Sequence, residues 1–114
     1  MAALYKIMSR NHWKKALENG VYEGSEVDRR DGFIHLSAAD QAHETAQKHF
    51  AGQQDLVLVA VSAGDLGESL KWEVSRGGAL FPHLYGVLPL AAVTGTVPLP
   101  LVNGSHEFPE GFPQ

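Results

Sequence analysis

A run of eight residues near the middle of the chain, DLVLVAVS at 55–62, constrains the fold more than any other feature. It is apolar at almost every position, whereas a strand with one face in water alternates apolar and polar side chains. Such a run is typical of a strand that is covered on both faces. The sequence therefore predicts a layered domain with a central strand at 55–62.

The first third of the chain has patterns of a strand, a helix and a loop. LYKIM at 4–8 predicts a strand. The segment 10–19 predicts a helix, because Ser9 is a suitable N-cap and Gly20 a suitable C-terminal stop. The charged, turn-rich residues 22–32 predict an exposed loop.

The remaining elements complete a mixed fold. FIHLS at 33–37 predicts a strand, and SAAD at 37–40 resembles a capping box that opens a second helix ending at about Phe50. LKWEV at 70–74 is a further strand, and AAVTGTVPLPLV at 91–102 supplies one or two more. We expect an α+β fold with two helices against a mostly antiparallel sheet.

The length of 114 residues fits one domain. We place it at residues 1–102. Pro98 and Pro100 should confine its last strand to an edge or end the pairing there. Residues 103–114 are rich in Gly and Pro and predict an extended or frayed tail.

Charge and composition exclude several classes of function. Nine Lys and Arg face thirteen Asp and Glu, for a net charge of −4, which argues against a general grip on nucleic acid. A small ligand that needs one or two cations is compatible with this balance. The chain has no Cys, no signal-like start and no apolar run of about 20 residues. These features predict a cytoplasmic protein with no membrane segment.

The strand at 33–37 carries the first candidate site residues. Side chains alternate along a strand, so Ile34 and Leu36 point one way while Phe33, His35 and Ser37 point the other. With the two aliphatic residues in the core, His35 and Ser37 would face a ligand. The alternative is a His35 whose ring is hydrogen-bonded to backbone and has no further role.

A second group of candidates lies in LKWEVSRGGALFPHLYG at 70–86. Alternation places Trp72 and Glu73 on opposite faces of a strand, with Trp72 most simply in the core. Glu73 is either a solvated carboxylate or the partner of Arg76, and an exposed pair of that kind is worth only ~0–1 kcal/mol. Stability alone therefore gives little reason for these charges.

The glycine pair in the same segment suggests a place for an anion. Gly77 and Gly78 allow a ligand to approach the main chain closely. Their bare N–H groups, with Arg76 alongside, could hold a phosphate or a carboxylate. Pro82 restrains Phe81 to an extended conformation and so fixes how His83 and Tyr85 are presented. The alternative is a Gly-rich turn followed by a strand whose aromatic residues fill the core.

Metal binding and thiol chemistry are not expected. His35, His83 and Glu73 would form a two-His, one-carboxylate set, but no HxxxH or HxH spacing accompanies them. The chain also has no GxSxG nucleophile elbow. We therefore predict no metal site.

Four strings in the chain resemble one bacterial family. DGFIHLS, DLVLVAV, LKWEVSRGGALFPHLYG and LPLAAV are similar to the family catalogued as domain of unknown function 952. The resemblance extends from residue 4 to about residue 97. That family is grouped by fold with the ADP-ribosyltransferases. The resemblance implies a split, strongly bent antiparallel sheet whose cleft, in relatives, holds NAD.

The same resemblance implies roles for individual residues. His35 is most similar to the strand histidine that contacts the adenosine ribose, Tyr85 or Trp72 would stack on nicotinamide, and Glu73 would be the carboxylate beside the reacting ribose. No copy of the family's catalytic Glu motif follows the last strands. The remaining residues expected to bind the nucleotide are Ser37, Arg76, Gly77, Gly78 and His83.

The resulting hypothesis is an ADP-ribosyltransferase-like domain that binds NAD or a related nucleotide and transfers ADP-ribose, with NAD as substrate. No sequence pattern specifies the acceptor. One alternative is a non-catalytic small-ligand-binding module that keeps the cleft without the chemistry. The other is a structural role for the polar run, with Glu73 paired to Arg76.

Overall fold

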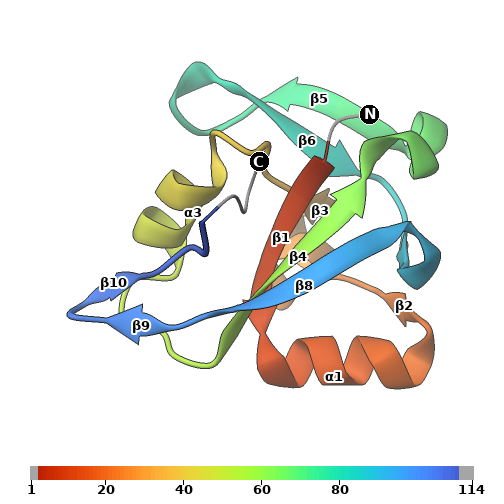
Figure 1. The fold of residues 1–114 in the computed structure, drawn as a ribbon. Helices are drawn as coiled ribbons and strands as arrows, with labels where there is room; N and C mark the ends of the chain where they lie inside the picture. The colour runs from red at the N-terminus through yellow and green to blue at the C-terminus, as the bar shows by residue number, and fades with distance from the viewer. Residues whose placement is uncertain (1–2, 111–114) are drawn as a thin grey trace.

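The central strand predicted from the apolar run is β4 (Leu56–Ser62), which is buried along almost its whole length. The computed structural model describes residues 3–110, apart from the side chain of Arg76. Figure 1 shows how the elements are arranged. In chain order the others are β1 (Ala3–Ser9), α1 (Arg10–Asn19), β2 (Val21–Tyr22), α2 (Glu26–Asp31), β3 (Ile34–His35), α3 (Ala42–His49), β5 (Leu70–Val74), β6 (Leu80–Leu84), β7 (Leu88–Pro89), β8 (Val93–Leu99), β9 (Leu101–Val102) and β10 (Ser105–His106).

Two three-stranded sheets form most of the domain. One has the order β1-β4-β8 and the other β3-β6-β5, and both are antiparallel. Two small antiparallel pairs, β2-β7 and β9-β10, complete the described sheets. β8 lies at an edge, as its prolines predict, with Pro98 opposite Val57. The fold is α+β, with mostly antiparallel, open sheets.

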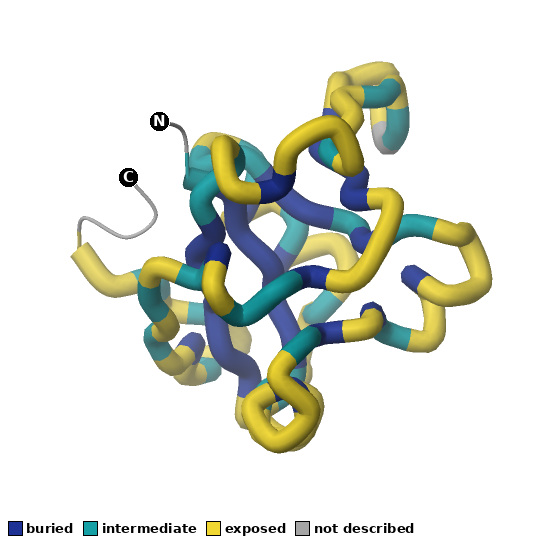
Figure 2. Tube along the Cα trace, turned by 90° about the vertical axis from the view of Figure 1, so that its right-hand side faces the viewer, coloured by how far each residue is buried: buried dark blue, intermediate teal, exposed yellow. Residues whose placement is uncertain are grey.

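The β1-β4-β8 sheet separates two hydrophobic cores. Along β4, Val57, Val59 and Val61 enter one core, with Leu4 and Met8 of β1. The intervening residues of β4 point to the other core, on the side of α3. Figure 2 shows the buried chain running through the centre of the molecule. The prediction of a strand covered on both faces is confirmed.

Helix α1 has the predicted boundaries. The Ser9 hydroxyl accepts the His12 backbone N–H at 3.1 Å, and Gly20 ends the helix in the left-handed region, with φ 80°. Trp13 packs against the core that contains Leu4 and Met8. Local capping signals were sufficient here because both ends of the helix are marked in the sequence.

The prediction of a loop at 22–32 is wrong, because this segment contains α2. Ser25 and Asp28 form a capping box, in which each side chain accepts the other's backbone N–H. Asp28 is buried, with only 2% of its surface exposed. The described part of the chain therefore has three α-helices rather than two. The high charge of this segment predicted a loop, although the Asp28 carboxylate in the middle of the helix points into the protein.

The capping box predicted at 37–40 is also wrong. The Ser37 hydroxyl lies 3.0 Å from that of Thr45, and α3 begins only at Ala42. The turn that precedes α3 is held by the Gln41 side chain, whose oxygen accepts the Ala38 N–H at 3.0 Å. The Ser37 hydroxyl thus links the segment after β3 to α3.

Trp72 is not a core residue, because 45% of its surface is exposed. It lies in β5, the outer strand of its sheet, opposite Pro82 of β6. Leu70, at the other end of β5, packs against the core. The β5–β6 hairpin thus extends past the body of the domain, and Trp72 lies on the part that extends.

The segment after β8 has more structure than an extended tail. β9 and β10 form a hairpin. Phe108 stacks on His43 of α3 with ring centroids 3.9 Å apart, and His106 Nε2 lies 2.8 Å from the Gln53 carbonyl. The part of the predicted tail at 111–114 lies outside the described residues. Within 3–110, no helix has the length and apolar character needed to span a bilayer.

Candidate functional site

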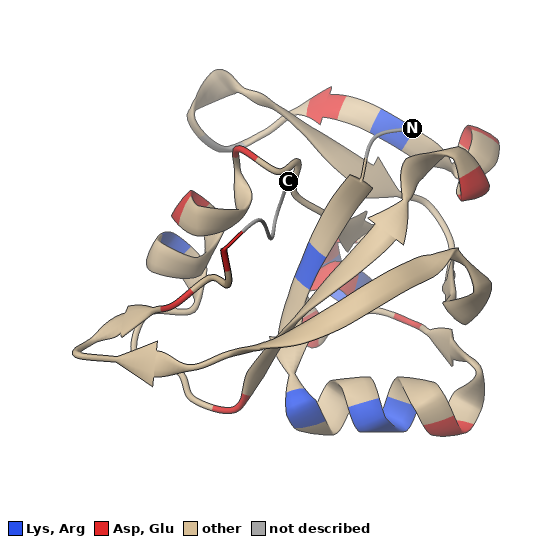
Figure 3. Cartoon of the chain, viewed as in Figure 1, with Lys and Arg blue, Asp and Glu red and all other residues tan. Residues whose placement is uncertain are grey.

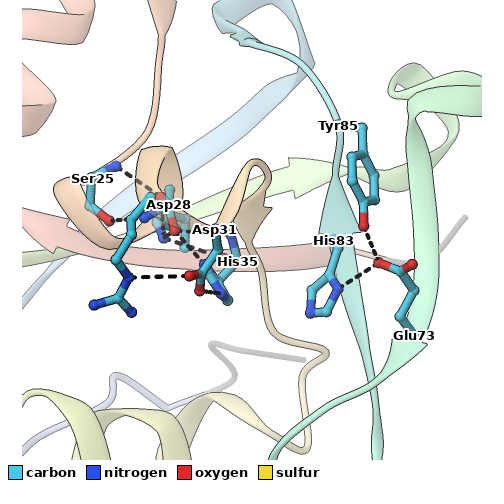
Figure 4. A network of polar contacts seen from close by, with 9 residues as sticks. Ser25, Asp28, Asp31, His35, Glu73, His83 and Tyr85 are labelled. Carbon is cyan, nitrogen blue, oxygen red and sulfur yellow. Dashed lines mark hydrogen bonds and ion pairs between the residues drawn. The ribbon is translucent and has the colours of Figure 1, made fainter.

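The antiparallel register of β3 and β6 brings the predicted histidines together. His35 lies directly opposite His83, with ring centroids 5.6 Å apart. Phe33 stacks on His83, with centroids 4.0 Å apart and planes 23° from parallel. These side chains share one face of the β3-β6-β5 sheet, where Figure 4 shows the polar groups around them.

A buried carboxylate organises one side of this face. Asp28 Oδ1 lies 2.6 Å from Nδ1 of His35 and accepts the His35 backbone N–H at 3.2 Å. The Lys6 ammonium lies 2.9 Å from Asp28 Oδ2. His35 Nε2 in turn lies 3.1 Å from Oδ2 of Asp31, one turn after Asp28. We call Lys6, Asp28, Asp31 and His35 the Asp28 network.

Lys6 occupies a position where an apolar residue is expected. Alternation along β1 puts it in the row of Leu4 and Met8, and it pairs with Val59 of the central strand. Its surface is only 7% exposed. Figure 3 shows that β4 and β8, beside it, carry no charge. A lysine is tolerated here because its ammonium donates hydrogen bonds to the Asp28 carboxylate and to the His35 carbonyl, 3.0 Å from Nζ.

The His35 ring lies between two carboxylates. Nδ1 faces an oxygen of Asp28, and Nε2 faces an oxygen of Asp31. The ring is therefore held between Asp28 and Asp31 in a fixed orientation.

Burial and partners act in opposite directions on the pKa of Asp28. Burial raises it, but the hydrogen bond from His35, the Lys6 charge and the Ser25 backbone hydrogen bond together hold the pKa well below its ordinary value. Asp28 is a carboxylate throughout the neutral range. Burial, together with the Asp28 charge, raises the pKa of Tyr22 far above its ordinary value, so its hydroxyl keeps its proton.

A second polar group lies at β5 and β6. Glu73 Oε1 accepts the Tyr85 hydroxyl at 2.7 Å and lies 2.8 Å from His83 Nδ1. The hydrogen bonds from Tyr85 and His83 lower the pKa of Glu73, and the Glu73 carboxylate raises that of Tyr85. We call these three residues the Glu73 cluster. His83 Nε2 is buried and has no hydrogen-bond partner among the described residues.

A pocket of about 630 Å³ lies beside the Asp28 network. Of the eight predicted site residues whose side chains the structure describes, only His35 and Ser37 line it. The other residues on its wall that matter here are Lys6, His12, Tyr22, Asp28, Arg30, Asp31 and Phe50. A volume of this size is within the range of small-molecule sites.

The other predicted residues lie elsewhere. The Glu73 cluster shares the sheet face with His35 but does not line the pocket. Trp72 alternates onto the opposite face. Gly77 and Gly78 form the hairpin turn between β5 and β6, with φ of 66° and 81°, and the Arg76 side chain lies outside the described part of the chain.

Several residues of the site were missed by the sequence analysis. Lys6, Asp28 and Asp31 hold His35, and Tyr22 places a buried hydroxyl on the pocket wall, without a hydrogen-bond partner among the described residues. Two signals were present: a lysine inside an apolar strand and an S-x-x-D capping pattern. No group of three or more His, Asp or Glu within 3–110 has an arrangement suited to a metal ion.

The family resemblance is supported by direct comparison. Residues 7–96 match the family described as "Protein of unknown function (DUF952)". The chain belongs to this family. A comparison with curated proteins finds no match.

Solved structures of one similar protein share the fold. The crystal structure of protein CC0527 from Caulobacter crescentus is 56% identical, with a TM-score of 0.89 over 92% of this chain and 93% of that one. The solution NMR structure of CC0527 is also 56% identical, with a TM-score of 0.82 over 93% of this chain and 91% of that one. A V27M/L66M double mutant of CC0527 is 54% identical, with a TM-score of 0.89 and the same coverage as the first.

Proposed function

We propose that the pocket beside the Asp28 network binds NAD or a related nucleotide. One observation carries the proposal: an imidazole fixed between two carboxylates forms part of the wall of a 630 Å³ pocket. Sites for small molecules combine an apolar wall with a few polar groups whose positions are fixed beforehand. The Asp28 network has such fixed groups, since its central carboxylate is buried.

The pocket wall offers partners for each part of a nucleotide. Asp31, about one third exposed, can accept hydrogen bonds from ribose hydroxyls. Arg30 and His12 supply cationic or hydrogen-donating groups for phosphate oxygens. Tyr22 can donate its unpartnered hydroxyl to a ligand acceptor, and Phe50 offers a ring for stacking. Binding of one small anion is compatible with a net charge of −4, which disfavours longer nucleic acids.

Transfer of ADP-ribose is the finer part of the proposal. Cleavage of the nicotinamide bond passes through an oxocarbenium-like state, which a nearby carboxylate stabilises. Glu73, the carboxylate first assigned this role, does not line the pocket. Asp31 is the other carboxylate on the wall and the more exposed of the two; its oxygens lie 3.1 Å from His35 Nε2 and 3.3 Å from Arg30 Nε, and we assign this role to it.

A non-catalytic binding module is the second candidate. It is favoured by the position of Glu73 outside the pocket and by the engagement of both His35 ring nitrogens with carboxylates. Such a module would keep nucleotide affinity and release no nicotinamide. Binding and turnover therefore need separate measurements.

The binding test is isothermal titration calorimetry with NAD, ADP-ribose and AMP. We expect wild type to bind at least one of them, and Asp31→Asn, Arg30→Gln and His35→Ala each to weaken that binding about tenfold or more. Arg76→Ala tests the hairpin arginine in the same way. Lys48→Gln is the matched control, since this exposed lysine of α3 pairs with Glu44 away from the pocket. Absence of binding at about 1 mM ligand, or unchanged binding in all four site variants, would reject the proposal.

The turnover test is nicotinamide release from NAD during long incubation. Transfer or hydrolysis predicts nicotinamide release by wild type that is lost in Asp31→Asn even at NAD concentrations that saturate the variant in calorimetry. Binding without release identifies the non-catalytic module. A loss of release in Glu73→Gln and not in Asp31→Asn would return the catalytic role to Glu73.

A further inference from the structure

β5 is an edge strand whose outer backbone groups have no partner among the described residues. It is the last strand in the order β3-β6-β5. The Tyr85 N–H donates to the Ser69 carbonyl and the Ser75 N–H to that of Ala79, so odd-numbered residues direct their backbone groups toward β6. The N–H and C=O groups of Trp72 and Val74 therefore point outward. An unpaired edge of this kind is a template for another strand.

The same hairpin exposes large apolar side chains. Trp72 is 45% exposed, Val74 70% and Leu80 52%. Val74 lies opposite Leu80, and Trp72 is two residues along on the same face of the sheet. Figure 1 shows β5 at the outer margin of the domain. Edge strands that remain single are usually protected by charge, proline or a covering element, and this one ends in exposed apolar residues.

The sequence of β5 is complementary to itself in antiparallel pairing. If Trp72 faces Trp72 of a second copy, Lys71 faces Glu73 of that copy, and Leu70 faces Val74. Each of the two Lys71–Glu73 pairs then joins charges of opposite sign, and both pairs lie on the sheet face opposite to that of Trp72. The outward groups of Trp72 form a hydrogen-bonded pair across the two-fold axis, because they are the free groups on both strands.

We infer that two copies of the chain associate through β5, joining their β3-β6-β5 sheets into one continuous six-stranded sheet. An isologous contact requires a self-complementary patch, and LKWEV provides one in backbone, charge and apolar side chains together. A strand from an unrelated protein would use the free backbone groups but would not account for the paired positions of Lys71 and Glu73. The inference does not depend on the proposed function.

Sedimentation equilibrium over a range of concentrations tests this inference. We expect wild type to approach twice the chain mass of 12.4 kDa. Lys71→Glu and Glu73→Lys each place like charges opposite one another and should raise the dissociation constant about tenfold or more. The double variant with both changes restores opposite charges and should return toward the wild-type constant, which a simple loss of contacts would not do.

A backbone variant and a surface control complete the test. Val74→Pro removes an outward N–H that has no partner among residues 3–110, so it should leave the fold intact by circular dichroism and abolish the dimer. The charge swap Glu44→Lys with Lys48→Glu on α3 should leave the mass unchanged. Wild type that is monomeric at about 1 mM, or a dimer unaffected by the β5 variants, overturns the inference. If wild type is monomeric, the candidate partner of the β5 edge becomes a strand from another protein.

Discussion

Replacing Asp28 with Asn should destabilise the domain severely. The substitution keeps the shape of the side chain but removes a negative charge that is 2% exposed. The Lys6 ammonium, 2.9 Å away and itself buried, would then lose the carboxylate that it contacts. Breaking a buried ion pair by removing one partner costs about 3–5 kcal/mol.

That loss is a large part of the stability of a small domain. Domains of this size are stable by about 5–15 kcal/mol, so Asp28→Asn should lower the melting temperature by on the order of 10–20 °C. Urea unfolding followed by circular dichroism gives the free-energy difference directly. Asp65→Asn is the matched control, because this exposed aspartate should change stability by no more than about 0.5 kcal/mol.

A double-mutant cycle isolates the contribution of the pair. Lys6→Met removes the cation that Asp28 neutralises, so the double variant of Lys6→Met with Asp28→Asn should be more stable than the sum of the single losses implies. We expect a coupling energy of about 2 kcal/mol or more. A loss below about 1 kcal/mol in Asp28→Asn, or additive single effects, would refute the view that Asp28 holds Lys6 in the core.

Three further predictions concern pH, backbone and the second polar group. Because the pKa of Asp28 is lower in the folded than in the unfolded state, its contribution to stability is complete above about pH 4 and declines at lower pH; the difference in unfolding free energy between wild type and Asp28→Asn should shrink accordingly in urea titrations from neutral to acid pH. Gly24→Ala should cost about 1–3 kcal/mol and more than Gly52→Ala, since both residues have positive φ but only at Gly24 would the new Cβ lie 2.9 Å from the Asp28 Cβ; equal losses in thermal unfolding would contradict this. Tyr85→Phe removes a donor to Glu73 and should raise the pKa of that carboxyl toward its ordinary value, as read from a ¹³C carboxyl NMR titration; an unchanged titration would show that His83 alone sets it.

The parts of the fold that sequence predicted well are those with strong local signals. β4 is apolar at nearly every position, and α1 has a capping serine and a terminal glycine. Helix α2 was missed because six residues rarely hold a helix in water on local interactions alone. Its stability comes from Asp28 reaching Lys6, more than twenty residues away in sequence, and no local pattern encodes such a contact.

In the candidate site, too, the features with a local sequence signal were predicted, and those that depend on tertiary contacts were not. His35 and His83 were both predicted from the sequence, but their position opposite each other comes from the register between β3 and β6, which depends on tertiary pairing. Trp72 was assigned to the core because aromatic residues in strands usually lie there, yet the hairpin extends past the surface that would cover it. Whether the predicted residues bind a nucleotide stays a prediction for calorimetry to decide.

The anchoring of α2 to β1 has a kinetic consequence. Asp31 and Arg30 lie on a helix whose middle residue is fixed to the central sheet by Lys6, so they already hold their positions before any ligand arrives. For the proposed ligand, these two groups would not need to become ordered during association. Stopped-flow traces should therefore show a single phase whose rate rises linearly with ligand concentration, without the plateau that a slow rearrangement imposes.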